Sequence, residues 1–252
     1  MRAVFAAVLL AAAALNLGAA SAAEVKVLTA GAFKSVVTAL APEFERRSGH
    51  KLVVANDTVG ALVRRIEAGE AFDLVVLTPQ AIEQLGRKGK IAAGTAANLA
   101  KVGIGVVVKQ GAPRPEIGSV EDFKRALLQA RSVAYIDPAA GGSSGIYLDQ
   151  LLTRLGIADA VKPKAVLVPG GLVAERVVNG EAEIGVHQIS EILAVEGAIL
   201  VGPLPPAIQN YTVYAAGVGA TARQPDAARA FLELLRSQDA ARVLTDRGMA
   251  PP

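Results

Sequence analysis

The sequence predicts an α/β fold made of two doubly wound lobes, with a ligand cleft between them. A short, mostly apolar strand is followed by a loop rich in glycine or hydroxyl residues and then by an amphipathic helix, and this order recurs along the chain. Three such units lie within residues 24–86, and a second series lies within residues 102–194. Units of this kind form a largely parallel sheet with helices on both faces. Because ligands bind beyond the carboxyl ends of such strands, the loops are expected to line the cleft.

The first series has the clearest periodicity. Strands are predicted at residues 24–29, 51–55 and 72–77, and helices at residues 33–48, 61–68 and 80–86. The first of these helices carries an apolar face, and Gly49 ends it. That face consists of Phe33, Val36, Val37, Leu40 and Phe44. The loops at residues 30–33, 56–60 and 78–79 follow the three strands and are predicted to face one crevice.

The remainder of the chain is expected to form a second lobe and then return to the first. Strands are predicted at residues 102–108, 133–136, 165–168, 183–188 and 211–218, and helices at residues 119–130, after the loop 137–145, and at residues 172–179, 190–194 and 225–236, with a shorter helix ending at 244. We assign residues 23–101 to the first part of lobe 1, residues 102–210 to lobe 2 and residues 211–252 to the return segment of lobe 1. Two short hinge crossings are expected, near residues 99–103 and 209–213.

Residues 1–22 are predicted to be a signal peptide. Arg2 precedes an apolar run over residues 4–15, and the small residues 20–22 precede an expected cleavage site before Ala23. The apolar run is too short to cross a membrane. We therefore expect an exported chain without a membrane anchor, located in the periplasm.

Composition excludes several classes of site. The sequence contains no cysteine, which removes disulfides, thiolate metal ligands, a cysteine nucleophile and a lipid-anchored cysteine. Loss of Arg2 with the leader leaves 25 of the 26 basic residues against 23 acidic ones, so the mature net charge is about +2. The basic residues are scattered and aromatic residues are few, so nucleic-acid binding is not expected. The sequence has no metal-ligand cluster and no phosphate-binding loop, so we expect no metal and no cofactor, and a monomer.

The loop at residues 137–145 is the strongest candidate for ligand contact. Asp137 and Pro138 open a turn after an apolar strand, and Ser143 and Ser144 lie between glycines where the next helix begins. Glycines let a backbone approach a ligand closely, and the free N–H groups of a helix start favour an anion. The serines add hydroxyl donors, or one of them is simply the N-cap of the helix. The sequence leaves both interpretations open.

The order of these parts resembles the type II periplasmic solute-binding proteins, and most closely the molybdate-binding group. The resembling segments are residues 27–33, 66–76, 145–147, 181–186 and 231–248, which together represent essentially the whole mature chain. The resemblance implies two α/β lobes joined by two crossings, with a small anion bound in the cleft between them. It also implies delivery of that solute to an ABC importer in the inner membrane.

Carried over position by position, the resemblance places ligand contacts at five points. They are Ala32, the segment at Val59-Gly60 with Thr58 close by, Ser144, the loop at Gly170-Gly171, and Gln188. The molybdate-binding group usually has hydroxyl residues at the first two points and tyrosine at the last. The backbone N–H donors at Ala32, Phe33 and Gly60 do not depend on these side chains, so an anion site is still expected. The departures favour an organic or larger anion over molybdate.

Several side chains near the cleft have two interpretations. His187 ends a short strand and is either a satisfied buried histidine or a group that faces the ligand, as a donor or a proton carrier. Lys34 is interpreted as a solvated charge that could reach an anion, and Arg65 as a solvated charge. Tyr147 is assigned to packing. Tyr211 and Tyr214 are assigned to packing in the hinge strand.

Two functions from different classes remain. The favoured one is a non-enzymatic binding protein that closes about a small anion by a hinge motion. The alternative is an enzyme on the same lobes, because the chain is also similar to periplasmic aconitate isomerases. In that case His187 is the candidate base, while Lys34 and the serine loop hold carboxylates.

Overall fold

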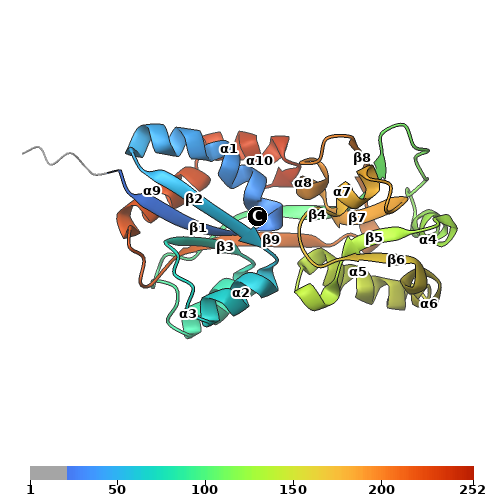
Figure 1. Cartoon of the computed structure of the whole chain (residues 1–252), viewed down its shortest axis with the longest axis horizontal. Helices are drawn as coiled ribbons and strands as arrows, with labels where there is room; N and C mark the ends of the chain where they lie inside the picture. Colours follow the sequence, from blue (N-terminus) through green and yellow to red (C-terminus); the bar gives the residue numbers. More distant parts are fainter. Residues whose placement is uncertain (1–21) are drawn as a thin grey trace, which may run out of the picture.

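The computed structural model describes residues 22–252 and has the predicted architecture of two α/β lobes. The lobes lie side by side along the long axis of the molecule (Figure 1). A ten-stranded sheet in the order β2-β1-β3-β9-β4-β7-β5-β6 runs through both of them, and β8 and β10 also pair with β4. The predicted signal peptide, apart from Ala22, lies outside the described residues. No helix within residues 22–252 has the length and apolarity needed to cross a membrane.

The strands and helices follow the predicted order closely. The strands are β1 (Glu24–Ala30), β2 (Lys51–Asp57), β3 (Leu74–Leu77), β4 (Ala97–Lys109), β5 (Val133–Ile136), β6 (Ala165–Val168), β7 (Ile184–Gln188), β8 (Ala198–Pro203), β9 (Tyr211–Val218) and β10 (Met249–Ala250). The helices are α1 (Gly31–Ser48), α2 (Val59–Glu67), α3 (Pro79–Arg87), α4 (Val120–Gln129), α5 (Ser143–Arg154), α6 (Ala158–Val161), α7 (Val173–Val178), α8 (Ile189–Ile192), α9 (Pro225–Leu235) and α10 (Gln238–Asp246). Short 3-10 turns lie at Pro138–Ala140, Lys162–Lys164 and Pro206–Ile208.

Sequence periodicity did not predict β8, and it placed the start of β4 too late. All but the last residue of β8 are half-buried, so this strand lacks the alternation of apolar and polar residues that identifies a half-buried strand. It pairs with β4 through an irregular register. β4 starts at Ala97 because it continues across both lobes, pairing with β9 in the first and with β7 and β8 in the second.

The hinge is a paired ribbon rather than two separate crossings. β4 and β9 run antiparallel, with Ala100 opposite Tyr214 and Val102 opposite Thr212. Just before β9, the side-chain amide of Gln209 accepts a hydrogen bond from the Ile104 N–H and donates one to its carbonyl, each at 2.9 Å. The amide thus extends the ladder by one pair. The sheet therefore continues from one lobe to the other, and the hinge is held by backbone pairing.

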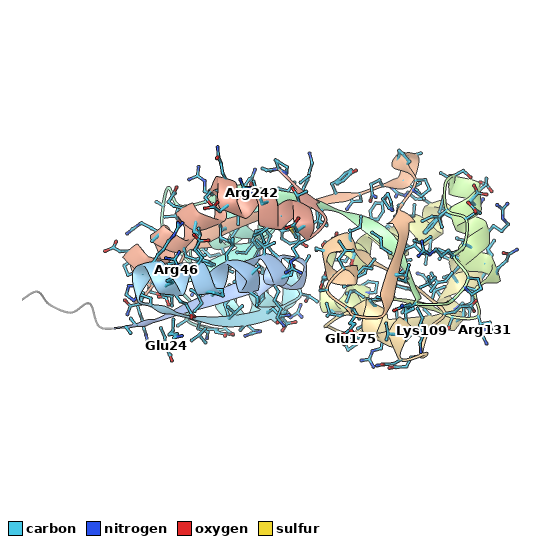
Figure 2. All side chains as sticks on the ribbon, turned by 90° about the horizontal axis from the view of Figure 1, so that it is seen from above. Glu24, Arg46, Lys109, Arg131, Glu175 and Arg242 are labelled. Atoms are coloured by element: carbon cyan, nitrogen blue, oxygen red, sulfur yellow. The ribbon has the colours of Figure 1, made fainter. Side chains whose placement is uncertain are left out.

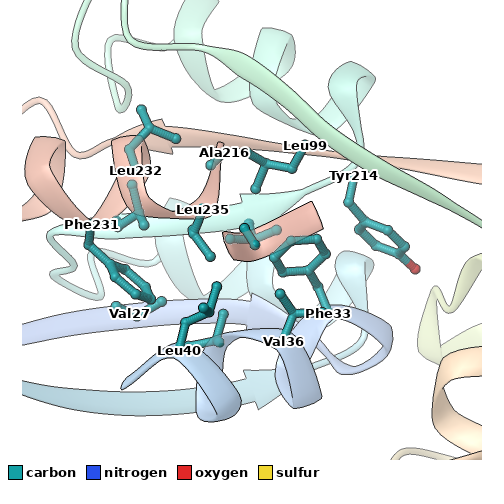
Figure 3. Packing of buried hydrophobic residues seen from close by; sticks show 14 of the residues in the cluster. Val27, Phe33, Val36, Leu40, Leu99, Tyr214, Ala216, Phe231, Leu232 and Leu235 are labelled. Carbon is teal, nitrogen blue, oxygen red and sulfur yellow. The ribbon is translucent and has the colours of Figure 1, made fainter. Parts of the chain in front are cut away.

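Each lobe buries apolar side chains on both faces of its sheet. In lobe 1, Val27 faces a cluster built with α1, α9 and α10, while Leu28 faces a second cluster built with α2 and α3. Figure 3 shows Phe33 and Phe231 inside the first cluster. Neighbouring residues of a strand point to opposite faces, so helices must cover both. This packing fixes the helix starts at the carboxyl edge of the strands.

The two lobes touch each other across the cleft. The Gly60 N–H at the start of α2 donates to the Gly141 carbonyl at 3.1 Å, and a Cβ on Gly60 would lie 2.9 Å from the Gly141 Cα. The Thr58 hydroxyl donates to the Ala140 carbonyl beside this contact. On the other side of the cleft, the Ser190 hydroxyl of α8 donates to the Ala32 carbonyl of α1 at 2.8 Å. The structure is therefore a closed arrangement of the lobes.

A buried carboxylate joins the return segment to lobe 1. Asp73, immediately before β3, is only 4% exposed. Its carboxylate accepts hydrogen bonds from the backbone N–H groups of Lys26 at 2.7 Å, Arg223 at 2.7 Å and Gln224 at 2.9 Å. These bonds connect the sheet to the start of α9. Asp73 therefore acts as a structural clamp.

Replacing Asp73 by Ala is expected to lower the free energy of unfolding by about 3 kcal/mol, because it leaves buried N–H groups without an acceptor. Urea denaturation measures the change. Asp226→Ala is the matched control, since Asp226 is exposed and its carboxylate pairs only with Arg229. We expect that control to lose less than about 1 kcal/mol. Equal losses in the two variants would show that Asp73 is not a clamp.

Candidate functional site

A cavity of about 650 Å³ lies between the lobes, a size typical of sites for small molecules. Its walls are the segments at the ends of β1 and β2 in lobe 1 and of β5, β6 and β7 in lobe 2. The hinge strand β9 contributes Tyr214, and Arg247 follows α10. Two of the three loops predicted to face the crevice, those at residues 30–33 and 56–60, contribute residues to it. The third prediction was wrong. α3 packs on the sheet face opposite α1, and Pro79 lines a separate groove.

Two long helices begin at the cavity without a side-chain cap. The N-cap residues are Ala30 for α1 and Gly142 for α5, and neither helix start has a capping side-chain hydrogen bond. By contrast, Thr58 caps α2, accepting from the Ala61 N–H at 3.2 Å. Uncapped N–H groups and the helix dipole favour an anion. The cavity is therefore suited to carboxylate or oxyanion groups at two points.

Neutral hydroxyl and amide groups form the floor of the cleft. The Gln188 side-chain amide donates to the Thr212 hydroxyl at 2.8 Å and to the Ser143 hydroxyl at 3.3 Å. Since Gly142 occupies the N-cap position, neither serine caps α5. Ser144 is buried and lines the cavity, with no hydrogen bond from its hydroxyl to another described residue. Gln188 Oε1 is also buried and has no hydrogen-bond partner among residues 22–252.

A buried histidine–glutamate pair lies in the cavity wall. His187 is 1% exposed and Glu191 is 8% exposed, and both line the cavity. His187 Nε2 lies 3.2 Å from Glu191 Oε2, while His187 Nδ1 has no partner among the described residues. Burial lowers the pKa of His187 to about 3 and raises the pKa of Glu191 to about 8. Both shifts favour the uncharged forms, so the pair holds one exchangeable proton at neutral pH.

Helix α1 begins directly against this pair. A Cβ on Gly31 would lie 2.5 Å from Glu191 Oε1, so only glycine permits this approach. Glu191 Oε1 is the carboxyl oxygen that does not contact His187. It therefore lies beside the anion-binding start of α1, next to where a bound carboxylate is expected.

Within residues 22–252, the cations that line the cavity are unpaired, whereas most of its acidic side chains are paired or buried. Lys34 on α1 and Arg247 after α10 both line it, and neither side chain forms an ion pair with another described residue. Asp57 also lines it, but pairs with Arg65 at 3.3 Å and accepts the Thr58 N–H at 2.9 Å. Arg65 thus neutralises the charge of Asp57, and burial keeps Glu191 protonated. Glu175 is exposed on α7. The cleft accordingly favours an anionic ligand.

Tyr214 faces the cleft instead of serving only the hinge strand. Its ring packs against Phe33, with ring centroids 6.1 Å apart, and its hydroxyl points away from the labelled apolar side chains (Figure 3). Tyr214 is 2% exposed and lines the cavity. Burial, and then the Glu191 carboxyl, raise the pKa of Tyr214. The phenol therefore remains a neutral hydroxyl donor in the cavity wall.

The structure brings together most of the residues that the sequence singled out. Those that line the cavity are Ala32, Thr58, Ser143, Ser144, Gly171, His187 and Gln188. Phe33, Gly60 and Gly170 are not among the lining residues. The Phe33 side chain lies in the core, and Gly60 instead contacts the opposite lobe. Tyr147 packs as expected, donating its hydroxyl to the Ile208 carbonyl at 2.8 Å.

Sequence reasoning missed Glu191, Thr212 and Arg247. Glu191 follows His187 by four residues, and this spacing across a strand–helix junction was the available signal. Thr212 is brought beside Ser143 by the pairing of β9 with β4, for which the sequence offers no local signal. Arg247 follows a helix whose cleft-facing end depends on the fold of the return segment. Among residues 22–252, no group of three histidine or acidic side chains is placed to hold a metal ion.

The raised pKa of Glu191 makes the stability of the folded protein depend on pH. The pKa of Glu191 is about 8 in the folded protein instead of the ordinary 4.5. The protonated carboxyl therefore contributes its full stabilisation below pH 4.5. This contribution is lost as pH rises through about 8. His187, with a folded pKa of about 3 instead of 6.5, contributes above pH 6.5 and loses its contribution as pH falls through about 3. The contribution of Glu191 is therefore lost as pH rises, and that of His187 is lost as pH falls.

We therefore expect the melting temperature of the parent to fall relative to Glu191→Gln as pH rises from about 4.5 to about 8, since glutamine removes the titration. Differential scanning fluorimetry across that range measures the difference. Glu175→Gln, at an exposed carboxylate of the same cavity, is the control and should run parallel to the parent. A constant difference between the parent and Glu191→Gln would contradict the raised pKa.

Comparison with known proteins agrees with this geometry. The family described as bacterial extracellular solute-binding protein matches residues 25–250. An aconitate isomerase from Pseudomonas sp is 35% identical over 231 residues, covering 89% of this chain and 87% of that protein. The molybdate-binding protein ModA of Azotobacter vinelandii is 30% identical over 182 residues, covering 69% of this chain and 68% of that one.

The fold has a close counterpart among solved structures. The periplasmic molybdate-binding protein of Azotobacter vinelandii superposes with a TM-score of 0.76 at 21% identity, covering 90% of this chain and 99% of that structure. Two closed α/β lobes, an anion-favouring cleft between them and a family match over nearly the whole described chain lead to one assignment. The chain belongs to the family of bacterial extracellular solute-binding proteins.

Proposed function

We propose that this chain is a periplasmic isomerase that moves a proton within an unsaturated tricarboxylic acid of the aconitate type. The observation that carries the proposal is the buried His187–Glu191 pair in the wall of an anion-favouring cleft. A proton-shifting enzyme needs a titratable group whose pKa is moved toward neutrality and which lies beside the bound substrate, and Glu191 is such a group. The 35% identical relative named as an aconitate isomerase supports the same conclusion.

Carboxylate recognition is assigned to the neutral donors of the cleft. The uncapped starts of α1 and α5 offer N–H groups, and Ser143 and Ser144 add hydroxyls. These groups bind a carboxylate without charge neutralisation, as helix starts do for other anions. The lobes are joined at Gly60 and Gly141, and the buried part of the cleft at Ser144 and Gln188 has a low effective dielectric, which strengthens these interactions.

The proposed reaction moves protons only among the substrate, Glu191 and His187, so none is gained or lost overall. Glu191 first passes its proton to His187 Nε2, and its carboxylate then takes a proton from the substrate methylene. The C–H electron pair forms a new carbon–carbon double bond, and the former double-bond electrons take a proton on the distal carbon from Glu191. His187 returns the stored proton to Glu191. trans-Aconitate becomes cis-aconitate, and no oxidant, reductant or metal is consumed.

A second function has its own support. The two-lobed closed fold and the 30% identical molybdate-binding relative favour capture of an anion for an ABC importer in the inner membrane. The missing hydroxyls at Ala32, Gly60 and Gln188 favour an organic carboxylate over molybdate for that role. Capture requires the same carboxylate donors but no proton transfer. The two functions therefore differ at Glu191.

Proton NMR of trans-aconitate in D2O distinguishes an isomerase from a protein that only captures the anion. The parent is expected to form cis-aconitate, with the proton that Glu191 takes from one carbon delivered to the other. Glu191→Gln should lower turnover by at least roughly a hundredfold, typical for loss of a general base, while His187→Gln also impairs it. Both variants should bind tricarballylate, the saturated analogue, within a few-fold of the parent. Tight binding by the parent without isomerisation would leave only the capture function.

Closure is tested at the glycine contact. Gly60→Ala suits a helix, but its Cβ would meet Gly141, so we expect about tenfold weaker binding of tricarballylate from the steric cost. Gly86→Ala in α3 is the matched control, because a Cβ there meets nothing within 4 Å. Isothermal titration calorimetry gives both affinities. Unchanged affinity in Gly60→Ala would mean that the ligand-bound state does not use this contact.

A further inference from the structure

The cavity extends along α1 beyond the helix start. Gly31, Lys34, Ser35 and Thr38 all line it, and their spacing of three and four residues places them on one face of the helix. Seven residues of α-helix span about 10 Å, so this face reaches well past the floor formed by Ser143 and its partners. The Ser35 hydroxyl is buried there without a hydrogen-bond partner among the described residues. The extension therefore offers space for a further ligand group.

The return segment contributes a cation to this cavity. Arg247 follows α10 and precedes β10, which pairs with β4. The adjacent Gly248 has φ +70°, and a Cβ on it would lie 2.7 Å from Ile189 Cγ2 of α8. This close approach holds the Arg247 turn against α8. Arg247 is half-buried and lines the same cavity as Lys34.

The charge of Arg247 has no partner among residues 22–252. Its side chain forms no hydrogen bond or ion pair there. Two arginines of α9 and its C-cap differ, since Arg229 pairs with Asp226 at 2.9 Å and Arg236 with Glu233 at 3.0 Å. Lys34 likewise has no acidic partner in the described part of the chain. A guanidinium held in a cleft without a counter-charge is available for bidentate binding of a carboxylate.

Glu191 lies against the start of α1. Gly31 approaches Glu191, the side chains of Ser143 and Gln188 are joined by a hydrogen bond, and Lys34 lies one turn further along α1. Carboxylates at the starts of α1 and α5 and a third near Lys34 would therefore place the carbons that join them near Glu191. Substrate carbons that exchange a proton must lie at this point.

We propose that Lys34 and Arg247 form an outer cationic subsite that binds a third carboxylate, beyond the two that the starts of α1 and α5 can hold, and so makes the cleft selective for tricarboxylates over dicarboxylates. The inference rests on the proposed function and adds the substrate class that the site selects. Arg247 is a specificity-determining residue in this account. It recognises the ligand by charge, whereas the floor recognises it through neutral donors.

Calorimetric titration of two ligands into the parent and Arg247→Gln tests the subsite. The ligands are tricarballylate and glutarate, a dicarboxylate of the same main-chain length that lacks the third carboxylate. We expect Arg247→Gln to weaken tricarballylate binding by roughly ten- to a hundredfold, as for loss of a charged hydrogen bond, and glutarate binding by less than about threefold. Arg247→Lys should recover part of the loss. Arg242→Gln, on the return-segment helix α10 (Figure 2), is the control and should match the parent.

The outcomes separate this inference from the proposed function. Equal weakening of both ligands, or none of either, overturns the subsite even if the parent isomerises trans-aconitate. Binding of neither ligand by the parent also overturns it. Selective loss of tricarballylate binding in a parent that shows no turnover supports the subsite and removes the isomerase. Melting temperatures of the variants close to that of the parent verify that each is folded.

Discussion

Burial of the His187–Glu191 pair is the constraint on which the proposed function depends. The lobes meet at Gly60 and Gly141 and again where Ser190 donates to Ala32, and His187, Ser190 and Glu191 are buried in the cavity wall. Without that burial Glu191 would be an ordinary carboxylate that repels an anionic ligand. With it, the carboxyl stays protonated beside His187, so a cleft whose helix starts favour an anion also holds a proton-bearing acid.

Binding and chemistry are assigned to different kinds of group. In the proposed function, neutral donors at two helix starts and at Ser143 bind carboxylates by hydrogen bonds, while Lys34 and Arg247, which line the same cavity, add positive charge. The proton-carrying pair lies in the wall of that cavity. The paired hinge ribbon of β4 and β9 explains how this arrangement is maintained, because it carries Thr212 and Tyr214 to the cleft while joining the lobes. A change in lobe closure would therefore alter all three components together.

The fold was predictable from the sequence because strand and helix periodicities are local signals. The loop at residues 137–145 was predictable for the same reason, since glycines and serines before a helix are recognisable in sequence. Glu191 and Arg247 were not, because their importance arises from burial and from the absence of a partner, which only the folded chain determines. Tyr214 was assigned to packing because one side of its ring does pack, against Phe33. The lobe boundaries at residues 101 and 210 remain predictions.

The state of the His187 imidazole at neutral pH tests the central claim most directly. The sequence has two histidines, so a His50→Gln variant labelled with ¹⁵N-histidine reports on His187 alone. Our account predicts one protonated and one unprotonated ring nitrogen at pH 7, the signature of a neutral imidazole that shares a hydrogen bond with protonated Glu191. Two protonated ring nitrogens at pH 7 would mean a charged His187 beside an ionised Glu191, and would contradict the neutral pair on which the account depends.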